Sequence, residues 1–206
     1  MVVGLIGVLA LQGGYQRHAD HLDRCGVKWC LVRNAETLAR CAALILPGGE
    51  STAITRLLQA EKLLEPLRRF TQSHPVMATC AGLIMMARSN DARVESLNAL
   101  DLDVARNAYG RQIKSFQCSI QIDLGTDSDS FPAVFIRAPQ IMQYGPSVTV
   151  LAQHQGSPVL VAQGWHLGMT FHPELSDDLR VHRYWLERIA ALHDAVVSQK
   201  ESLCKT

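Results

Sequence analysis

Short apolar runs alternate with helix-like segments along the first part of the chain. The runs are rich in aliphatic and β-branched residues, which is typical of parallel strands buried on both faces. They predict strands at residues 2–10, 28–32 and 42–46. Between them, apolar side chains near helical spacing predict helices at 15–25 and 35–40, and Gly26 suits a helix C-terminus. The alternation predicts an α/β fold with a mostly parallel central sheet and helices on both faces.

Two more helices precede the next buried run. Ser51 or Thr52 could cap a helix that continues to Gln59, and a second helical pattern covers residues 62–72. Pro66 falls in the first turn of that second helix, where its missing N–H costs least. The apolar run that follows, from Pro75, leads into a cysteine and a further helix.

The character of the sequence changes after Ser89. Short β-rich segments with turn signals between them predict antiparallel strands appended to the parallel sheet, at 113–123, 131–136, 147–153 and 158–163. Residues 165–171 predict a late strand, and residues 177–197 predict an amphipathic helix. The inner face of that helix is predicted to hold Leu179, Tyr184, Leu186 and Ile189. We interpret residues 1–197 as one domain and 198–206 as a polar C-terminal tail.

Composition narrows the class of protein. The chain has 206 residues, 48% of them apolar and 19% charged, with a formal net charge of +1, so no electrostatic feature favours nucleic acid or an anionic membrane as a partner. Six cysteines show no zinc-finger spacing, and the first residues lack both a signal-peptide pattern and a membrane-spanning run. These observations predict a cytoplasmic protein with reduced thiols and no metal site.

Cys80 is the first candidate for chemistry. It stands between an apolar strand-like run and a helical one, and its neighbours two positions away, Ala78 and Gly82, are small. A nucleophile on a sharp strand-to-helix turn has strained backbone angles and requires such neighbours. Because free cysteine is also commonly buried as a small hydrophobe, this stretch alone is equally consistent with a core cysteine in a strand-to-helix corner.

His172 and Glu174 form the second candidate. If the segment is extended, two residues that are two apart project to the same side, so the carboxylate could orient the imidazole and stabilise its protonated form. The imidazole could then take a proton from a cysteine. A surface His-Pro-Glu turn without chemical function explains the same three residues.

Gly48 and Gly49 are the third candidate. Two glycines at the C-terminal end of a strand let the backbone approach a ligand and present N–H groups to it, which could contribute to an oxyanion hole together with the N–H after Cys80. The glycine spacing does not fit a phosphate-binding loop. In isolation, these glycines are better explained as a turn that caps the next helix.

In combination, these stretches resemble class I glutamine amidotransferases, and more specifically the family of glutaminase subunits of pyridoxal 5'-phosphate synthase. The stretches that carry the resemblance are Gly7–Gly13, Leu46–Thr52, Thr79–Leu83, Arg106–Gln112, Val134–Pro139 and Phe171–Leu175. Two of these stretches, Arg106–Gln112 and Phe135–Pro139, distinguish this family from other amidotransferase glutaminases. The chain departs from the family pattern at Ala78, where the family often has glycine, and at Ala108-Tyr109, where it usually has Ser-Phe.

The resemblance implies a role for each matching residue. It makes Cys80 the nucleophile, His172 the general base and then acid, and Glu174 the residue that orients His172. It implies an oxyanion hole from the backbone N–H groups of Gly49 and Ala81. The residues that it implies for binding L-glutamine are Gly49, Glu50, Ser51, Arg106, Ile136 and Arg137. An arginine suits this substrate because a guanidinium can clamp the α-carboxylate.

The resemblance also implies the reaction and the partner. Glutamine is hydrolysed to glutamate and ammonia without a metal or organic cofactor, and the ammonia passes to a synthase subunit that makes pyridoxal 5'-phosphate. Two other interpretations stay open on the residues alone: a glutaminase that serves another synthase, for example one with an imidazole or guanine product, and a catalytically idle subunit that regulates its partner.

Overall fold

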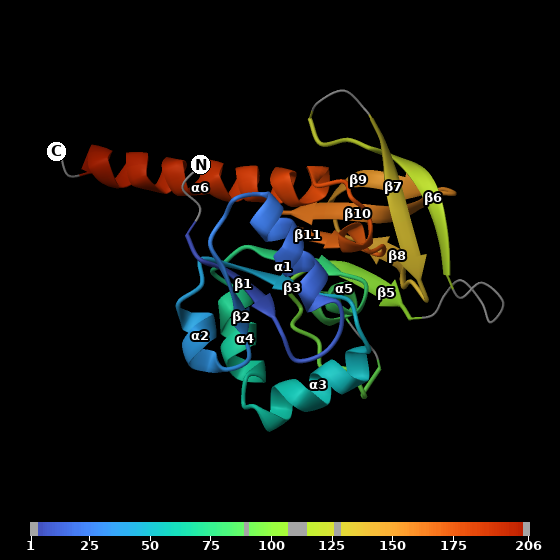
Figure 1. Cartoon of the computed structure of the whole chain (residues 1–206), viewed down its shortest axis with the longest axis horizontal. Coiled ribbons are helices and arrows are strands. Elements are labelled where there is room, and N and C mark those ends of the chain that lie inside the picture. The colour runs from blue at the N-terminus through green and yellow to red at the C-terminus, as the bar shows by residue number, and fades with distance from the viewer. Residues whose placement is uncertain (1–3, 89–90, 107–114, 126–128, 204–206) are drawn as a thin grey trace.

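The computed structural model describes residues 4–88, 91–106, 115–125 and 129–203. Its centre is a nine-stranded sheet with the order β2-β1-β3-β4-β11-β10-β9-β6-β7 (Figure 1). The first five of these strands are parallel to one another and the others pair antiparallel, so the predicted α/β class with appended antiparallel strands is confirmed.

The parallel half is formed by β2 (Trp29–Val32), β1 (Ile6–Leu9), β3 (Ala43–Leu46), β4 (Val76–Thr79) and β11 (His166–Met169). Each strand lies within a predicted apolar run. The late strand β11 pairs with β4 in the register Leu167 to Met77 and Met169 to Thr79. Parallel strands end at the same edge of a sheet, so the loops after β1, β3, β4 and β11 meet there.

The antiparallel half consists of β10 (Ser157–Gln163), β9 (Thr149–His154), β6 (Ser115–Ile122) and β7 (Asp129–Ile136). Two strands that the sequence pattern did not predict, β5 (Leu102–Ala105) and β8 (Gln140–Tyr144), form a separate two-stranded sheet. Most of β8 is exposed, including Met142 and Tyr144, so it lacks the apolar–polar alternation by which a half-buried strand is recognised.

The helices cover both faces of the sheet, as predicted. On one face, α1 (Tyr15–Arg24) and α6 (Arg180–Leu203) pack through residues such as Leu22 and Trp185 against Ile45 and Met77 (Figure 1). The opposite face carries α2 (Ala35–Ala39), α3 (Ser51–Ala60), α4 (Leu64–Thr71) and α5 (Ala81–Met86). Within the described ranges, none of the helices has the length and apolarity that a bilayer crossing requires.

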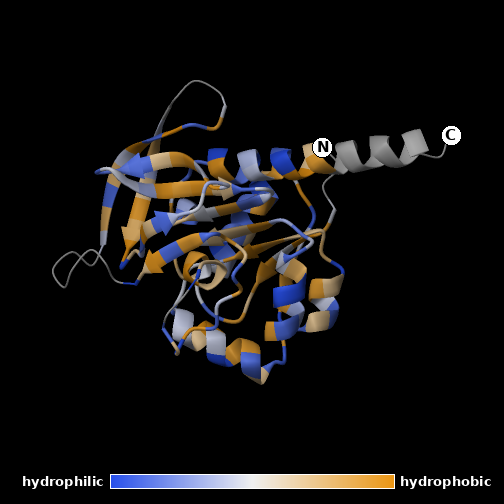
Figure 2. Cartoon of the chain, turned by 180° about the vertical axis from the view of Figure 1, so that it is seen from behind, coloured by the Kyte–Doolittle hydropathy of each residue, from blue (hydrophilic) through white to orange (hydrophobic). Residues whose placement is uncertain are grey.

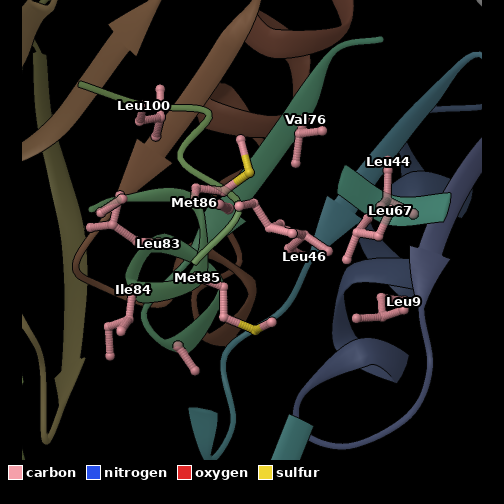
Figure 3. Packing of buried hydrophobic residues seen from close by; sticks show 14 of the residues in the cluster. Leu9, Leu44, Leu46, Leu67, Val76, Leu83, Ile84, Met85, Met86 and Leu100 are labelled. Carbon is pink, nitrogen blue, oxygen red and sulfur yellow. The ribbon is translucent and has the colours of Figure 1, made fainter. Parts of the chain in front are cut away.

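Two apolar clusters, one on each face, hold these layers together. Alternate residues of β3 serve both clusters, with Leu44 and Leu46 on the α5 side and Ala43 and Ile45 on the α1 side. Figure 3 shows Leu44 and Leu46 beside side chains of α4 and α5. The hydropathy colouring in Figure 2 shows apolar stretches within the sheet, mixed with polar ones in its antiparallel half. The strands bordering the candidate site are therefore fixed from both sides.

Three local features differ from the prediction. Glu50, and neither Ser51 nor Thr52, is the N-cap of α3, because its carboxylate accepts hydrogen bonds from the N–H groups of Thr52 and Ala53. Residues Pro173–Leu175 form a short 3-10 helix (η1), so the segment after His172 is not extended. The last helix continues beyond Val197 to Leu203.

The core of the α5 side generates a test of stability. Replacing Leu44 with alanine should lower the free energy of unfolding by about 2–5 kcal/mol, because the buried side chain leaves a cavity between β3 and the helices. The matched control is Leu192→Ala on the exposed side of α6, which should change it by less than about 0.5 kcal/mol. Urea titration of both variants measures the difference, and equal effects would contradict this account of the core.

Candidate active site

A cavity of about 390 Å³ lies at the edge of the sheet where the parallel strands end. Clefts at this edge are the usual ligand sites of open α/β sheets. All the candidate site residues named from the sequence line this cavity: Gly49, Glu50, Ser51, Cys80, Ala81, Arg106, Ile136, Arg137, His172 and Glu174. The fold therefore brings together residues that are widely separated along the chain.

Cys80 sits on a strained turn between β4 and α5. Its φ of 48° and ψ of −102° lie outside the regions that residues with a side chain normally adopt, which costs on the order of 1–3 kcal/mol. Its N–H donates to the carbonyl oxygen of Met169 at 2.9 Å, which ties the turn to β11. The small neighbour at Gly82 is required, because a Cβ there would lie 2.2 Å from the carbonyl oxygen of Leu46.

His172 and Glu174 form a tight pair beside Cys80. Nδ1 of His172 lies 2.7 Å from Oε1 of Glu174, and both side chains are buried. The predicted pair is present although the segment is not extended: the 3-10 turn at Pro173 folds the carboxylate back toward the ring. The N–H of His172 donates to the carbonyl oxygen of Val134 at 2.8 Å, which fixes the backbone at this point.

The pair is electrically charged at neutral pH. Burial lowers the pKa of His172, but hydrogen bonds with Cys80 and Glu174 and the charges of both groups outweigh burial and raise it to about 10. Burial also raises the pKa of Glu174, yet His18 and the bond to His172 hold it below its usual value. An imidazolium held beside a thiol stabilises the thiolate when the proton leaves sulfur.

The Gly48-Gly49 turn packs directly on this pair. A Cβ at Gly48 would lie 2.2 Å from Cε1 of His172, so the ring occupies the space that a side chain would need. The carbonyl oxygen of Gly48 accepts from the N–H of Gly14 at 3.0 Å, and the N–H of Glu50 donates to Oε1 of Gln12 at 2.8 Å. The loop after β1 therefore supports the loop after β3.

Arg106 stands at the side of the cavity between two carboxylates. Nη1 lies 2.6 Å from Oδ2 of Asp91, and Nη2 lies 3.4 Å from Oε1 of Glu50. Hydrogen bonds from Arg93 and Arg106 hold the pKa of Asp91 well below its usual range. The guanidinium is thus oriented before any substrate arrives.

Ile136 and Arg137 close the cavity on the side of β7. The carbonyl oxygen of Ile136 lies 3.8 Å from Sγ of Cys80, and Arg137 has a φ of 42°, which is uncommon for a residue with a side chain. The rest of the predicted arginine motif, residues 107–112, lies outside the described residues.

Several residues of this region were not predicted as site residues. Gln12 and Leu175 line the cavity, and His18 lies 3.3 Å from Glu174 beneath it. Gln12 lies in the loop after a buried strand, three residues beyond its end, which is a signal that could have placed it at the edge of the sheet. No signal of this kind was available for His18, because it lies inside a helix whose spacing reads as an ordinary amphipathic pattern.

Comparisons with known proteins show which family the chain is similar to. Residues 8–191 match the SNO glutamine amidotransferase family. A similar protein from Thermotoga neapolitana, the pyridoxal 5'-phosphate synthase subunit PdxT, is 48% identical over 186 residues, which cover 89% of this chain and 98% of that protein.

Solved structures are similar as well. A crystal structure of a glutamine amidotransferase has 41% identity and a TM-score of 0.83, covering 91% of this chain and 100% of the other. A putative GMP synthase subunit from Thermoplasma acidophilum, at 14% identity and a TM-score of 0.68, covers 95% of this chain and 98% of its own. That second likeness shows the fold alone.

The packing of Gly48 on His172 generates a test. Gly48→Ala should displace the imidazole and slow the alkylation of Cys80 by iodoacetamide at pH 7 roughly tenfold, because the thiolate loses its cationic neighbour. Peptide mass spectrometry reads each cysteine separately, so Cys118 serves as an internal reference.

The control variant is Gly26→Ala. Gly26 has a φ of 71°, and a Cβ added there would meet nothing within 4 Å, so alanine strains the backbone without touching the cavity. Its Cys80 should react at the wild-type rate. An unchanged rate in Gly48→Ala would contradict the proposed dependence of the cysteine on His172.

Proposed function

Because the chain belongs to the SNO glutamine amidotransferase family, we propose that it is the glutaminase subunit of a pyridoxal 5'-phosphate synthase and that Cys80, His172 and Glu174 are its catalytic residues. The observation that carries the catalytic assignment is the strained Cys80 turn, which faces the buried His172–Glu174 pair across one cavity. The relatives named above carry the assignment of the substrate and of the vitamin B6 pathway.

The first half-reaction breaks the side-chain amide of glutamine. The thiolate of Cys80 attacks the amide carbon, and the carbonyl oxygen becomes an oxyanion. Backbone N–H groups of Gly49 and Ala81, both on the cavity wall, stabilise that charge. His172 gives its proton to the amide nitrogen and the C–N bond breaks. Ammonia departs, and the glutamyl group remains bound to Cys80 as a thioester.

The second half-reaction restores the enzyme. His172, now neutral, takes a proton from water as the water oxygen attacks the thioester carbon. The C–S bond breaks, glutamate leaves, and Cys80 returns to the thiolate beside a protonated His172. Glu174 keeps the ring in the required orientation throughout, through the 2.7 Å contact to Nδ1.

Binding of glutamine uses the polar wall of the cavity. Arg106 presents its guanidinium to the α-carboxylate of the substrate, and the pairing with Asp91 and Glu50 holds the group in place. Ser51, Ile136 and Arg137 also line the cavity. A zwitterionic amino acid suits a site where a guanidinium and a carboxylate stand side by side.

Delivery of ammonia requires a partner. Free ammonia would protonate in water, so a synthase subunit that receives it directly is the consistent arrangement, as the name of the Thermotoga relative indicates for that protein. We place the chain in the cytoplasm, which agrees with the free thiols of the described cysteines. A synthase with a purine product is not favoured, because the similarity to the putative GMP synthase subunit is confined to the fold.

The nucleophile can be tested in the assembled synthase. With Cys80→Ala, pyridoxal 5'-phosphate formation from glutamine should fall by a factor of about 10⁴ or more, because no other group can form the thioester. The same assembly should still make the product when an ammonium salt replaces glutamine. Full turnover of glutamine by the variant would rule out the mechanism, whereas loss of both activities would point to a damaged assembly.

The role of Arg106 can be tested by kinetics. Arg106→Ala should raise KM for glutamine about 10- to 100-fold, with a smaller change in kcat, because a charged hydrogen bond to the substrate is lost. The control is Arg88→Ala, which removes an arginine that is paired with Asp101 and Asp103 and does not line the cavity. A KM that is equal in the two variants would show that Arg106 does not bind glutamine.

A further inference from the structure

Three buried histidines continue from Glu174 into the core on the α1–α6 side of the sheet. Nε2 of His18 lies 3.3 Å from Oε2 of Glu174, Nδ1 of His18 lies 3.0 Å from Nε2 of His182, and Nδ1 of His182 lies 3.2 Å from Nδ1 of His21. His18 and His21 come from α1, and His182 comes from the first turn of α6, which packs beside α1 (Figure 1). The catalytic mechanism above uses none of them.

One carboxylate oxygen of Glu174 needs a hydrogen-bond donor, which the row formed by His18, His182 and His21 can supply. Its side chain is buried, and Oε1 is engaged by His172. Among the residues that the structure describes, Oε2 has no properly formed hydrogen bond, and the ring of His18 is the polar group that stands against it. A buried carboxylate oxygen without a donor is costly, and it would be free to turn away from His172.

The positions of the ring nitrogens select one tautomer of His18. With its proton on Nε2, neutral His18 presents an N–H donor 3.3 Å from Oε2 of Glu174, and its Nδ1 can accept from Nε2–H of His182 at 3.0 Å. The opposite tautomer would accept from the hydroxyl of Thr79, 3.4 Å away, but would place a lone pair against the carboxylate oxygen. The carboxylate of Glu174 therefore favours the Nε2–H tautomer of His18, and His182 is placed to donate to the Nδ1 that remains.

We propose that His18 is a positioning residue for glutamine hydrolysis: as a neutral Nε2–H donor held by His182, it anchors the second oxygen of Glu174 and thereby the orientation of His172. This inference rests on the function proposed above. His18 lies behind Glu174 and acts through it.

Electrostatics agree with a neutral donor. Burial, together with His172 and His21, lowers the pKa of His18 to about 4 against the opposing effect of Glu174, so the ring is uncharged at neutral pH. Burial also places the pKa of His182 well below its usual value. The titratable and charged groups that bear on Glu174 and on the row of rings are Cys80, His172, His18, His21, His182, Arg24 and Asp177.

Two substitutions of nearly equal size separate this role from packing. In His18→Gln the amide nitrogen takes the place of Nε2, so the donor to Glu174 is kept. In His18→Asn the shorter amide takes the place of Nδ1, so the contact with His182 is kept and the donor to Glu174 is lost. Both variants are assayed as the assembled synthase, beside the wild type and Cys80→Ala.

The expected result is a difference in kcat. His18→Asn should lower kcat for glutamine about 10- to 100-fold with little change in KM, and His18→Gln should recover most of that loss. The acid limb of the kcat profile should move to higher pH in His18→Asn, because a buried Glu174 without its donor holds a proton more strongly. Thermal unfolding of both variants shows whether either change merely loosens the core.

Each outcome decides the matter. Equal kcat in the two variants, whether both at the wild-type value or both reduced, would overturn the role of His18 while leaving the glutaminase assignment intact. A wild-type assembly without glutamine turnover would overturn both. A readout independent of activity is ¹⁵N NMR of histidine-labelled protein, which should show His18 neutral and protonated at Nε2 at pH 7; the Nδ1–H tautomer would also overturn the proposal.

Discussion

The hydrogen bond between His172 and Glu174 joins the catalytic edge of the sheet to the core behind it. A buried carboxylate is stable only if positive charge and hydrogen-bond donors surround it. Here the imidazolium of His172 supplies the charge on one side, and the rings of α1 and α6 lie on the other. The packing of these two helices and the chemistry of the cavity therefore depend on the same side chain.

Much of the candidate site could be predicted because its residues stand at the ends of buried strands. Cys80, Gly49 and His172 each follow a strand of the parallel half, and strand ends share an edge whatever the details of packing. The extended segment expected between His172 and Glu174 is not present, because Pro173–Leu175 form a 3-10 turn. The two side chains still lie on the same side, because the 3-10 turn also brings Glu174 back toward the ring of His172.

The parts that could not be predicted are those that tertiary contacts alone determine. His18 and His182 read as ordinary helix positions, and only the packing of α1 beside α6 brings Nδ1 of His18 to 3.0 Å from Nε2 of His182. The cap at Glu50 and the exposed strand β8 were missed for a related reason, since local preference and hydrophobic period do not distinguish them from their neighbours. The pairing of Arg106 with Asp91 joins two loops that carry no periodic signal at all.

The position of β11 has a consequence for how the protein is made. This strand lies at the middle of the sheet, between β4 and β10, although it follows the other described strands in the sequence. Until β11 is translated, the edge of β4 that it will occupy is unpaired. The apolar side chains that later pack against α6 are exposed to water during this time. The nucleophile turn also lacks its anchor on Met169 during this time. The active site can therefore form only after β11 has been translated and has paired with β4.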